Sequence, residues 1–155
     1  MNFGYPSGSP CVLLKLNKIY GLVPEYYNTT EELPDDMPDM VRDNIAAAAD
    51  KNKIWVSCMG EYPADKEAVE SFEYFPADAG FSSAYFPYLN QAGYQSPLVA
   101  VRLNNIPAGQ LVHIECRAWA KNIKYDRRDR IGIVHFEVVA HNEDSAKLVN
   151  NFASN

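Results

Sequence analysis

The chain has 155 residues, which is enough for one domain with a sizeable buried core. Its 14 basic and 20 acidic residues give a net charge of −6, which argues against a general binder of nucleic acid or of anionic membranes. No apolar stretch approaches the roughly 20 residues that cross a bilayer, and the N-terminal residues lack the basic flank and apolar centre of a secretory signal.

The composition nevertheless favours an exported protein. Three cysteines, ten tyrosines and ten prolines accompany many short β-type runs, a combination that is common in extracellular sandwiches. The chain taken by itself would be classed as cytosolic. We expect instead that it is a piece whose targeting segment is absent from this sequence.

The first predicted element is a strand over residues 12–21, which partly alternates apolar and polar side chains and is ended by Gly21. Residues 25–40 are rich in prolines and acids and are predicted to form a surface loop. Within this loop, Asn28-Thr29-Thr30 is an acceptor sequence for N-glycosylation, although such tripeptides also arise by chance. The site has meaning only in an exported chain.

A helical insertion is predicted next, over about residues 36–52. Apolar side chains recur at helical spacing over residues 36–49, with Asp36 available as the N-cap and Pro38 tolerated in the first turn. This is the one interior helix that the sequence predicts clearly. The strand that follows, residues 54–60, carries Cys58 on its apolar face.

The remaining strands are predicted at residues 71–75, 97–106, 110–120 and 131–141, with a loop over residues 76–83. In residues 110–120, one face is apolar and includes Cys116, whereas the other face is polar or aromatic. The pattern predicts a mainly β protein, an antiparallel β-sandwich with a short helical insertion. The C-terminal tail, residues 143–155, is compatible with a short amphipathic helix.

The three cysteines leave one thiol without a partner. Cys58 and Cys116 lie on the apolar faces of two predicted strands, which suits a bridge between the inward faces of two sheets. Two reduced cysteines that pack as small apolar side chains fit the same pattern, so the residues alone leave both interpretations open. Cys11 follows a turn at the head of the first strand.

No constellation of residues points to catalysis or to a metal. His113 and His135 lie at polar-facing strand positions without metal-ligand spacing nearby, and we interpret them as surface histidines. The acidic run at residues 35–39 lacks the glycine and the distal glutamate of a calcium loop. The basic cluster at residues 121–130 is interrupted by aspartates, which favours a charged connection between strands. We therefore predict no catalytic residue, no metal and no cofactor.

The stretch FSSAYFPYLNQAGY, residues 81–94, has five aromatic residues around a proline and no clear alternation. It fits a loop that is tucked against the sandwich. It also fits an exposed aromatic anchor for a partner, because tyrosine and phenylalanine supply a large contact area at a small entropic cost.

Four segments in order resemble the family of sodium/potassium and proton/potassium pump beta subunits. CVLLKLNKIYGLVPE resembles the family's segment of cysteine, aliphatic residues and Lys-Leu-Asn, and VSCMGE resembles its short strand with a cysteine. AYFPYLN resembles the family's Tyr-Tyr-Pro-Tyr-Tyr-Gly element, and residues 97–138 resemble its C-terminal strands nearly position by position. The resemblance covers roughly residues 8–140.

The resemblance implies an immunoglobulin-like ectodomain over residues 1–142, which a short cytoplasmic tail, one membrane helix and a stalk would precede. Such a subunit is a single-pass type II protein of the plasma membrane and is not an enzyme. It binds the catalytic alpha subunit, supports its folding and export, and modulates its potassium affinity. The alternative is a cell-adhesion module whose partner is a beta subunit on a neighbouring cell.

The resemblance also assigns roles to particular residues. It implies that Cys58 pairs with Cys116 and that the partner of Cys11 lies upstream, outside this sequence. It further implies that Tyr85, Phe86, Pro87 and Tyr88 contact the alpha subunit, although Leu89 and Asn90 stand where the family has tyrosine and glycine. Asn28 remains a candidate glycan site.

Overall fold

A computed structural model describes residues 3–141 and confirms the predicted antiparallel β-sandwich with its helical insertion. The predicted tail and the predicted domain end at residue 142 lie outside the described residues. Within that range no helix is long and apolar enough to cross a membrane. The elements are η1 (Tyr5–Ser7), β1 (Cys11–Lys15), α1 (Asp39–Ala47), β2 (Lys53–Gly60), α2 (Pro63–Ala68), β3 (Ser71–Phe75), β4 (Gly80–Ser82), η2 (Ser83–Tyr85), β5 (Leu98–Asn104), β6 (Leu111–Trp119) and β7 (Ile133–Val139).

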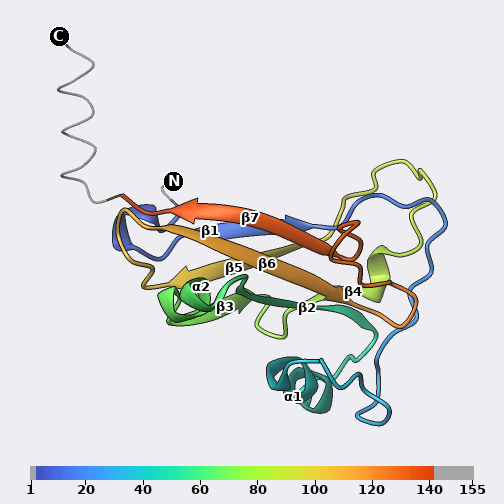
Figure 1. Ribbon diagram of the computed structural model, residues 1–155. Coiled ribbons are helices and arrows are strands. Elements are labelled where there is room, and N and C mark those ends of the chain that lie inside the picture. Colours follow the sequence, from blue (N-terminus) through green and yellow to red (C-terminus); the bar gives the residue numbers. More distant parts are fainter. Residues whose placement is uncertain (1–2, 142–155) are drawn as a thin grey trace.

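The strands form two antiparallel sheets (Figure 1). One sheet has the order β1-β5-β3 and the other has the order β4-β2-β6-β7. Consecutive strands β5 and β6 belong to different sheets, so the connection between them crosses the sandwich. The charged segment at residues 121–130 connects β6 to β7, as predicted.

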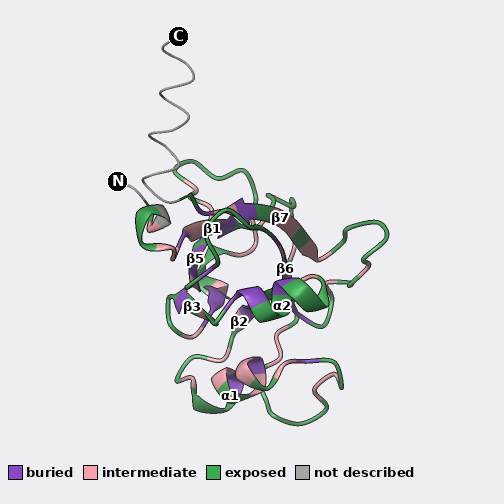
Figure 2. Ribbon diagram, turned by 60° about the vertical axis from the view of Figure 1, so that its left-hand side comes forward, coloured by how far each residue is buried: buried purple, intermediate pink, exposed green. Residues whose placement is uncertain are grey.

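The main core lies between the two sheets and follows the period-2 pattern of the strands. Val99, Val101 and Leu103 of β5 are fully buried and face Val112 and Ile114 of β6 across the sandwich. Burying aliphatic side chains of this size stabilises the fold by about 1.5–3 kcal/mol each. In Figure 2 the buried residues are concentrated in the strands, whereas the loops are mostly exposed.

A second, smaller core lies on the outer face of the four-stranded sheet, under α1. Val41 and Ile45 of α1 are buried against Trp55 of β2 and Trp119 of β6, which lie directly opposite each other in the ladder. The sequence predicted a polar or aromatic second face for residues 110–120, and Trp119 lies on that face, where α1 covers it. The helical insertion therefore buries two tryptophans that would otherwise be exposed on the outer face of the sheet.

The predicted strand over residues 12–21 is wrong in its second half. β1 ends at Lys15, which pairs with Leu98, the first residue of β5. Pro97 precedes Leu98 and has no backbone N–H, so the ladder cannot continue past this point. Residues 16–23 leave the sheet and pass over the surface.

Asp36 does not cap α1, in contrast to the prediction. The helix begins at Asp39 with Pro38 at the N-cap and no side-chain cap. Asp36 instead accepts a hydrogen bond from Arg117 of β6, with 2.6 Å between Oδ2 and Nη1, and this bond lowers the pKa of the Asp36 carboxyl. The interaction ties the loop before α1 to the sheet that α1 covers.

The sequence reasoning missed two short elements. The loop predicted at residues 76–83 contains β4, whose three residues pair with Lys53, Ile54 and Trp55 of β2. The helix α2 begins with Pro63 in its first turn, and Asp65 accepts a hydrogen bond from the backbone N–H of Tyr62. Pro63 and Asp65 are ordinary signals for a helix start, but the helix is only six residues long.

Asp65 joins α2 to the four-stranded sheet. Its buried carboxylate accepts backbone N–H bonds from Tyr62 at 3.1 Å and from His113 of β6 at 3.0 Å. Burial raises the pKa of Asp65, but these hydrogen bonds and the nearby His113 side chain outweigh burial and hold the pKa below its ordinary value.

We predict that Asp65→Asn lowers the free energy of unfolding by about 1–3 kcal/mol at pH 7. One carboxylate oxygen becomes an NH₂ group, which cannot accept the backbone N–H of Tyr62 or of His113. A lowered pKa means that the carboxylate stabilises the fold above the ordinary aspartate value of about 4, and that this contribution is lost as the pH falls through the folded-state pKa. The difference from wild type should therefore narrow below about pH 4.

Urea unfolding at pH 7 and pH 3 measures this difference. The matched control is Asp35→Asn, because Asp35 is exposed and its side chain has no hydrogen bond among the described residues. If Asp65→Asn lowers the free energy of unfolding no more than Asp35→Asn does, or by the same amount at both pH values, the Asp65 carboxylate does not stabilise the fold through these hydrogen bonds.

Candidate functional site

The structure joins Cys58 of β2 to Cys116 of β6 by a disulfide. The two residues lie directly opposite each other in the same antiparallel ladder, with their Cα atoms 4.0 Å apart. The predicted bridge between the two sheets is therefore wrong in its geometry, since the bond lies within one sheet. It fixes the register of β2 against β6.

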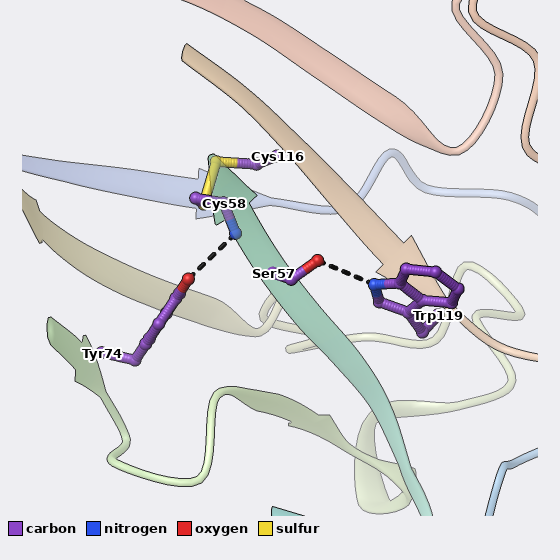
Figure 3. The surroundings of a disulfide bond; sticks show 5 residues. All are labelled: Ser57, Cys58, Tyr74, Cys116 and Trp119. Carbon is purple, nitrogen blue, oxygen red and sulfur yellow. Dashed lines mark hydrogen bonds between the residues drawn. A yellow bond between two sulfur atoms is a disulfide. The ribbon is translucent and has the colours of Figure 1, made fainter. Parts of the chain in front are cut away.

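A hydrogen bond from the same position links the two sheets (Figure 3). The N–H of Cys58 points away from β6, at the edge of β2 and beyond the residues that pair with β4. It donates to the hydroxyl of Tyr74 at 2.9 Å. Tyr74 belongs to β3 of the other sheet and is buried, which raises the pKa of its phenol. On the other side of β2, the hydroxyl of Ser57 accepts a hydrogen bond from the indole N–H of Trp119 at 2.8 Å.

Cys11 and Asn28 lie at separate places on the surface. Cys11 is half-buried at the start of β1 and forms no disulfide within the described residues. Asn28 is exposed in the loop before α1, where its side-chain amide donates to Asn52 at 3.3 Å. The acceptor sequence is therefore accessible to solvent.

The four aromatic and proline residues of the predicted contact element do not act alike. Tyr85 ends η2 and is 42% exposed. Phe86 packs against the main core, and Pro87 and Tyr88 are half-buried. Phe86 anchors the loop to the sandwich, while Tyr85 is exposed on the surface; contact of Tyr85 with a partner stays a prediction.

Tyr88 belongs to a cluster that the sequence did not predict, which we call the aromatic platform: Lys18, Tyr20, Tyr88 and Tyr94. The Tyr88 ring lies 4.8 Å from the Tyr94 ring and 6.4 Å from the Tyr20 ring, centroid to centroid, and Lys18 Nζ lies over Tyr88 and Tyr94 at 5.5 and 5.8 Å. Contacts of both kinds contribute about 0.5–1.5 kcal/mol each beyond area burial.

The platform is held by the backbone of residues 16–23. Tyr20 and Tyr88 form an isolated parallel bridge, and the N–H of Gly21 donates to the carbonyl of Tyr88 at 2.8 Å. Ile19, Tyr20 and Val23 remain largely exposed, with 72% of Tyr20 accessible to solvent. Figure 1 shows this segment running beside the loop of residues 83–97 at the same end of the molecule.

The two histidines of the outer sheet face lie beside carboxylates rather than in open solvent. His135 is only 16% exposed and lies between Glu61, at 3.2 Å from Nδ1, and Glu115, at 3.6 Å from Nε2. Arg127 bonds both carboxylates. Burial raises the pKa of Glu61, but hydrogen bonds from His135 and Arg127 outweigh burial and lower it. Among residues 3–141 no group of three His, Cys, Asp or Glu side chains could hold a metal ion.

Comparison with known proteins adds a family to this geometry. The family model described as sodium/potassium ATPase beta chain matches residues 1–136. The chain is 47% identical over 143 residues to the sodium/potassium-transporting ATPase subunit beta-2 of Drosophila melanogaster, and 48% identical over 141 residues to subunit beta-1 of the same species. It is 30% identical over 142 residues to subunit beta-1 of Tetronarce californica.

These matches include most of the chain but less than half of each relative. They cover 89%, 89% and 88% of this chain, against 44%, 45% and 44% of the three relatives.

The bond between Cys58 and Tyr74 generates a prediction about stability. Tyr74→Phe keeps the ring but leaves a buried backbone N–H without a partner, which should lower the free energy of unfolding by about 1–3 kcal/mol. Tyr85→Phe removes a hydroxyl that has no hydrogen bond among the described residues and should be nearly neutral. Guanidinium unfolding under oxidising conditions compares the two, and equal shifts would show that the hydrogen bond does not link the sheets.

Proposed function

The chain belongs to the family of sodium/potassium ATPase beta chains, and we propose that it is the extracellular part of a non-catalytic pump subunit that binds the alpha subunit. In this role it supports the folding, export and stability of the alpha subunit and modulates potassium affinity. ATP hydrolysis belongs to the alpha subunit, so the chain contributes no catalytic residue and no cofactor.

The observation that carries this proposal is the aromatic surface at one end of the sandwich. Tyr85 is exposed within the proposed contact element, and the aromatic platform lies beside it. Tyrosine side chains at such a surface supply contact area with few rotatable bonds, which is why they are enriched among the residues that dominate binding energy. We assign Tyr85 and Tyr88 to direct contact with the alpha subunit.

Phe86 and Pro87, the other two residues of the proposed contact element, support the two tyrosines from the side of the core. Phe86 packs into the main core, and Pro87 is half-buried between it and Tyr88. Anchoring the loop in this way reduces the entropy that is lost when a partner binds. We therefore assign Phe86 and Pro87 to presenting the two tyrosines.

The proposed location is the extracellular side of the plasma membrane. A disulfide and an exposed acceptor sequence at Asn28 support an oxidising, exported environment. We propose that Asn28 carries a glycan and that a single membrane helix precedes this region in the full-length type II protein. Cys11 then pairs with a cysteine of the upstream chain, which accounts for the odd number of cysteines.

The alternative function is adhesion to a beta subunit on a neighbouring cell. The relatives named above carry the names of pump subunits, so the comparisons favour the pump role over adhesion.

We predict that the double variant Tyr85→Ala and Tyr88→Ala reduces co-purification with a sodium/potassium pump alpha subunit at least tenfold, because residues that dominate an interface cost about 2 kcal/mol or more when they are truncated. The protein is co-expressed with the alpha subunit and the captured alpha subunit is quantified. Thermal unfolding of the isolated variant shows whether the domain remains folded.

The control is Phe75→Ala, which removes a side chain that is 44% exposed on the edge strand β3, outside the proposed surface. It should leave co-purification unchanged. If a folded Tyr85/Tyr88 double variant assembles as well as this control, the assignment of the contact surface is incorrect.

A further inference from the structure

A groove of about 500 Å³ opens between the end of β1 and the start of β7. Its floor includes Leu14, Val56 and Phe81, which belong to the main core. Figure 1 shows that β1 ends and β7 begins at the end of the molecule where the loop of residues 83–97 lies. The groove is therefore an opening into the sandwich beside the aromatic platform.

Val134 shows that the sandwich is not closed here. It lies opposite Cys116 in the ladder, on the same face of β7 as Val138. Val138 is buried, whereas Val134 is 45% exposed. β1 and β7 are edge strands, each paired with one neighbour among the described residues. The N–H of Cys11 donates to the carbonyl of Phe3 at 2.7 Å, whereas the outward backbone groups in the rest of β1 and in β7 form no backbone hydrogen bond among the described residues.

The charges around the groove all have one sign. Of the five basic residues that line it, Arg117 is paired with Asp36, and the other four are Lys15, Lys18, Lys124 and Arg130; the lining contains no aspartate or glutamate. Within residues 3–141 none of these four side chains forms an ion pair or a side-chain hydrogen bond. In a chain with 20 acidic and only 14 basic residues, four unpaired cations around one apolar opening leave a local excess of positive charge.

We propose that this groove binds an extended, apolar segment of the alpha subunit that carries acidic side chains at its ends. The inference rests on the proposed function and extends the contact surface beyond Tyr85 and Tyr88. Apolar side chains of the segment cover Leu14, Val56 and Val134, while its carboxylates face the lysines and the arginine at the rim.

Continuity with the proposed contact favours a segment of the same partner. Tyr88 and Tyr94 of the aromatic platform also line the groove, so a chain that covers the platform reaches the groove. Free edge strands add a backbone component, because an extended segment can pair with an exposed sheet edge while its side chains fill the adjoining pocket.

The test reverses single charges at the rim in the co-expressed chain. Lys124→Glu changes a lysine of the connection between β6 and β7, and Lys18→Glu changes the lysine that lies over Tyr88 and Tyr94. The matched control is Lys66→Glu on α2, an exposed lysine with no ion pair among the described residues and no place in the groove. All three variants change the net charge by the same amount.

Both groove variants should lower the yield of co-purified alpha subunit about three- to tenfold at low ionic strength, and Lys66→Glu should not. The loss should shrink at about 0.5 M salt, because exposed charges are then screened. Groove variants that assemble like Lys66→Glu at both ionic strengths would overturn the inference.

The result is separable from a failure of the proposed function. If the Tyr85/Tyr88 double variant weakens assembly and the charge reversals do not, the groove inference fails and the proposed function stands. If neither set weakens assembly, both fail. Unfolding temperatures of the isolated variants confirm that the comparison is made between folded proteins.

Discussion

The pairing of β2 with β6 is the constraint on which the rest of the structure depends. Cys58 and Cys116 face each other across this ladder, so the disulfide fixes one register out of the many that two strands can adopt. That register places Trp55 opposite Trp119 for α1 to cover, and it turns the N–H of Cys58 toward Tyr74 of the second sheet. By fixing this register, one covalent bond determines where the outer helix packs, which side chains face the main core and where the two sheets are hydrogen-bonded.

The proposed contact surface follows from a local interruption of this regular architecture. Pro97 ends the β1–β5 ladder, and residues 16–23 leave the sheet to pair with Tyr88 instead. Their departure creates the aromatic platform and leaves the sandwich open between β1 and β7. Because residues 16–23 leave the sheet, tyrosines, the apolar side chains of the groove and unpaired lysines are exposed next to one another. This is the composition expected of a binding surface.

Period-2 alternation allowed the long strands to be predicted, because their inner faces fill a common core. The three-residue strand β4 and the short helix α2 have too few residues to show a period, so they were missed. Alternation also could not distinguish a bond within a sheet from one between sheets, or show that α1 covers Trp119. The aromatic platform could not be predicted because Lys18 and Tyr94 meet Tyr88 only in the folded chain, and because the alternation around Tyr20 favours a strand.

The most direct test of the account is a photo-crosslinking measurement on the assembled pump. A photoreactive phenylalanine analogue replaces Tyr20, which is 72% exposed beside Tyr88, or Tyr62, which is 52% exposed near α2 at the opposite end of the molecule. The account predicts a covalent product with the alpha subunit from position 20 and none from position 62. A product from position 62 alone, or equal yields from both positions, would contradict the assignment of the aromatic surface to the alpha subunit.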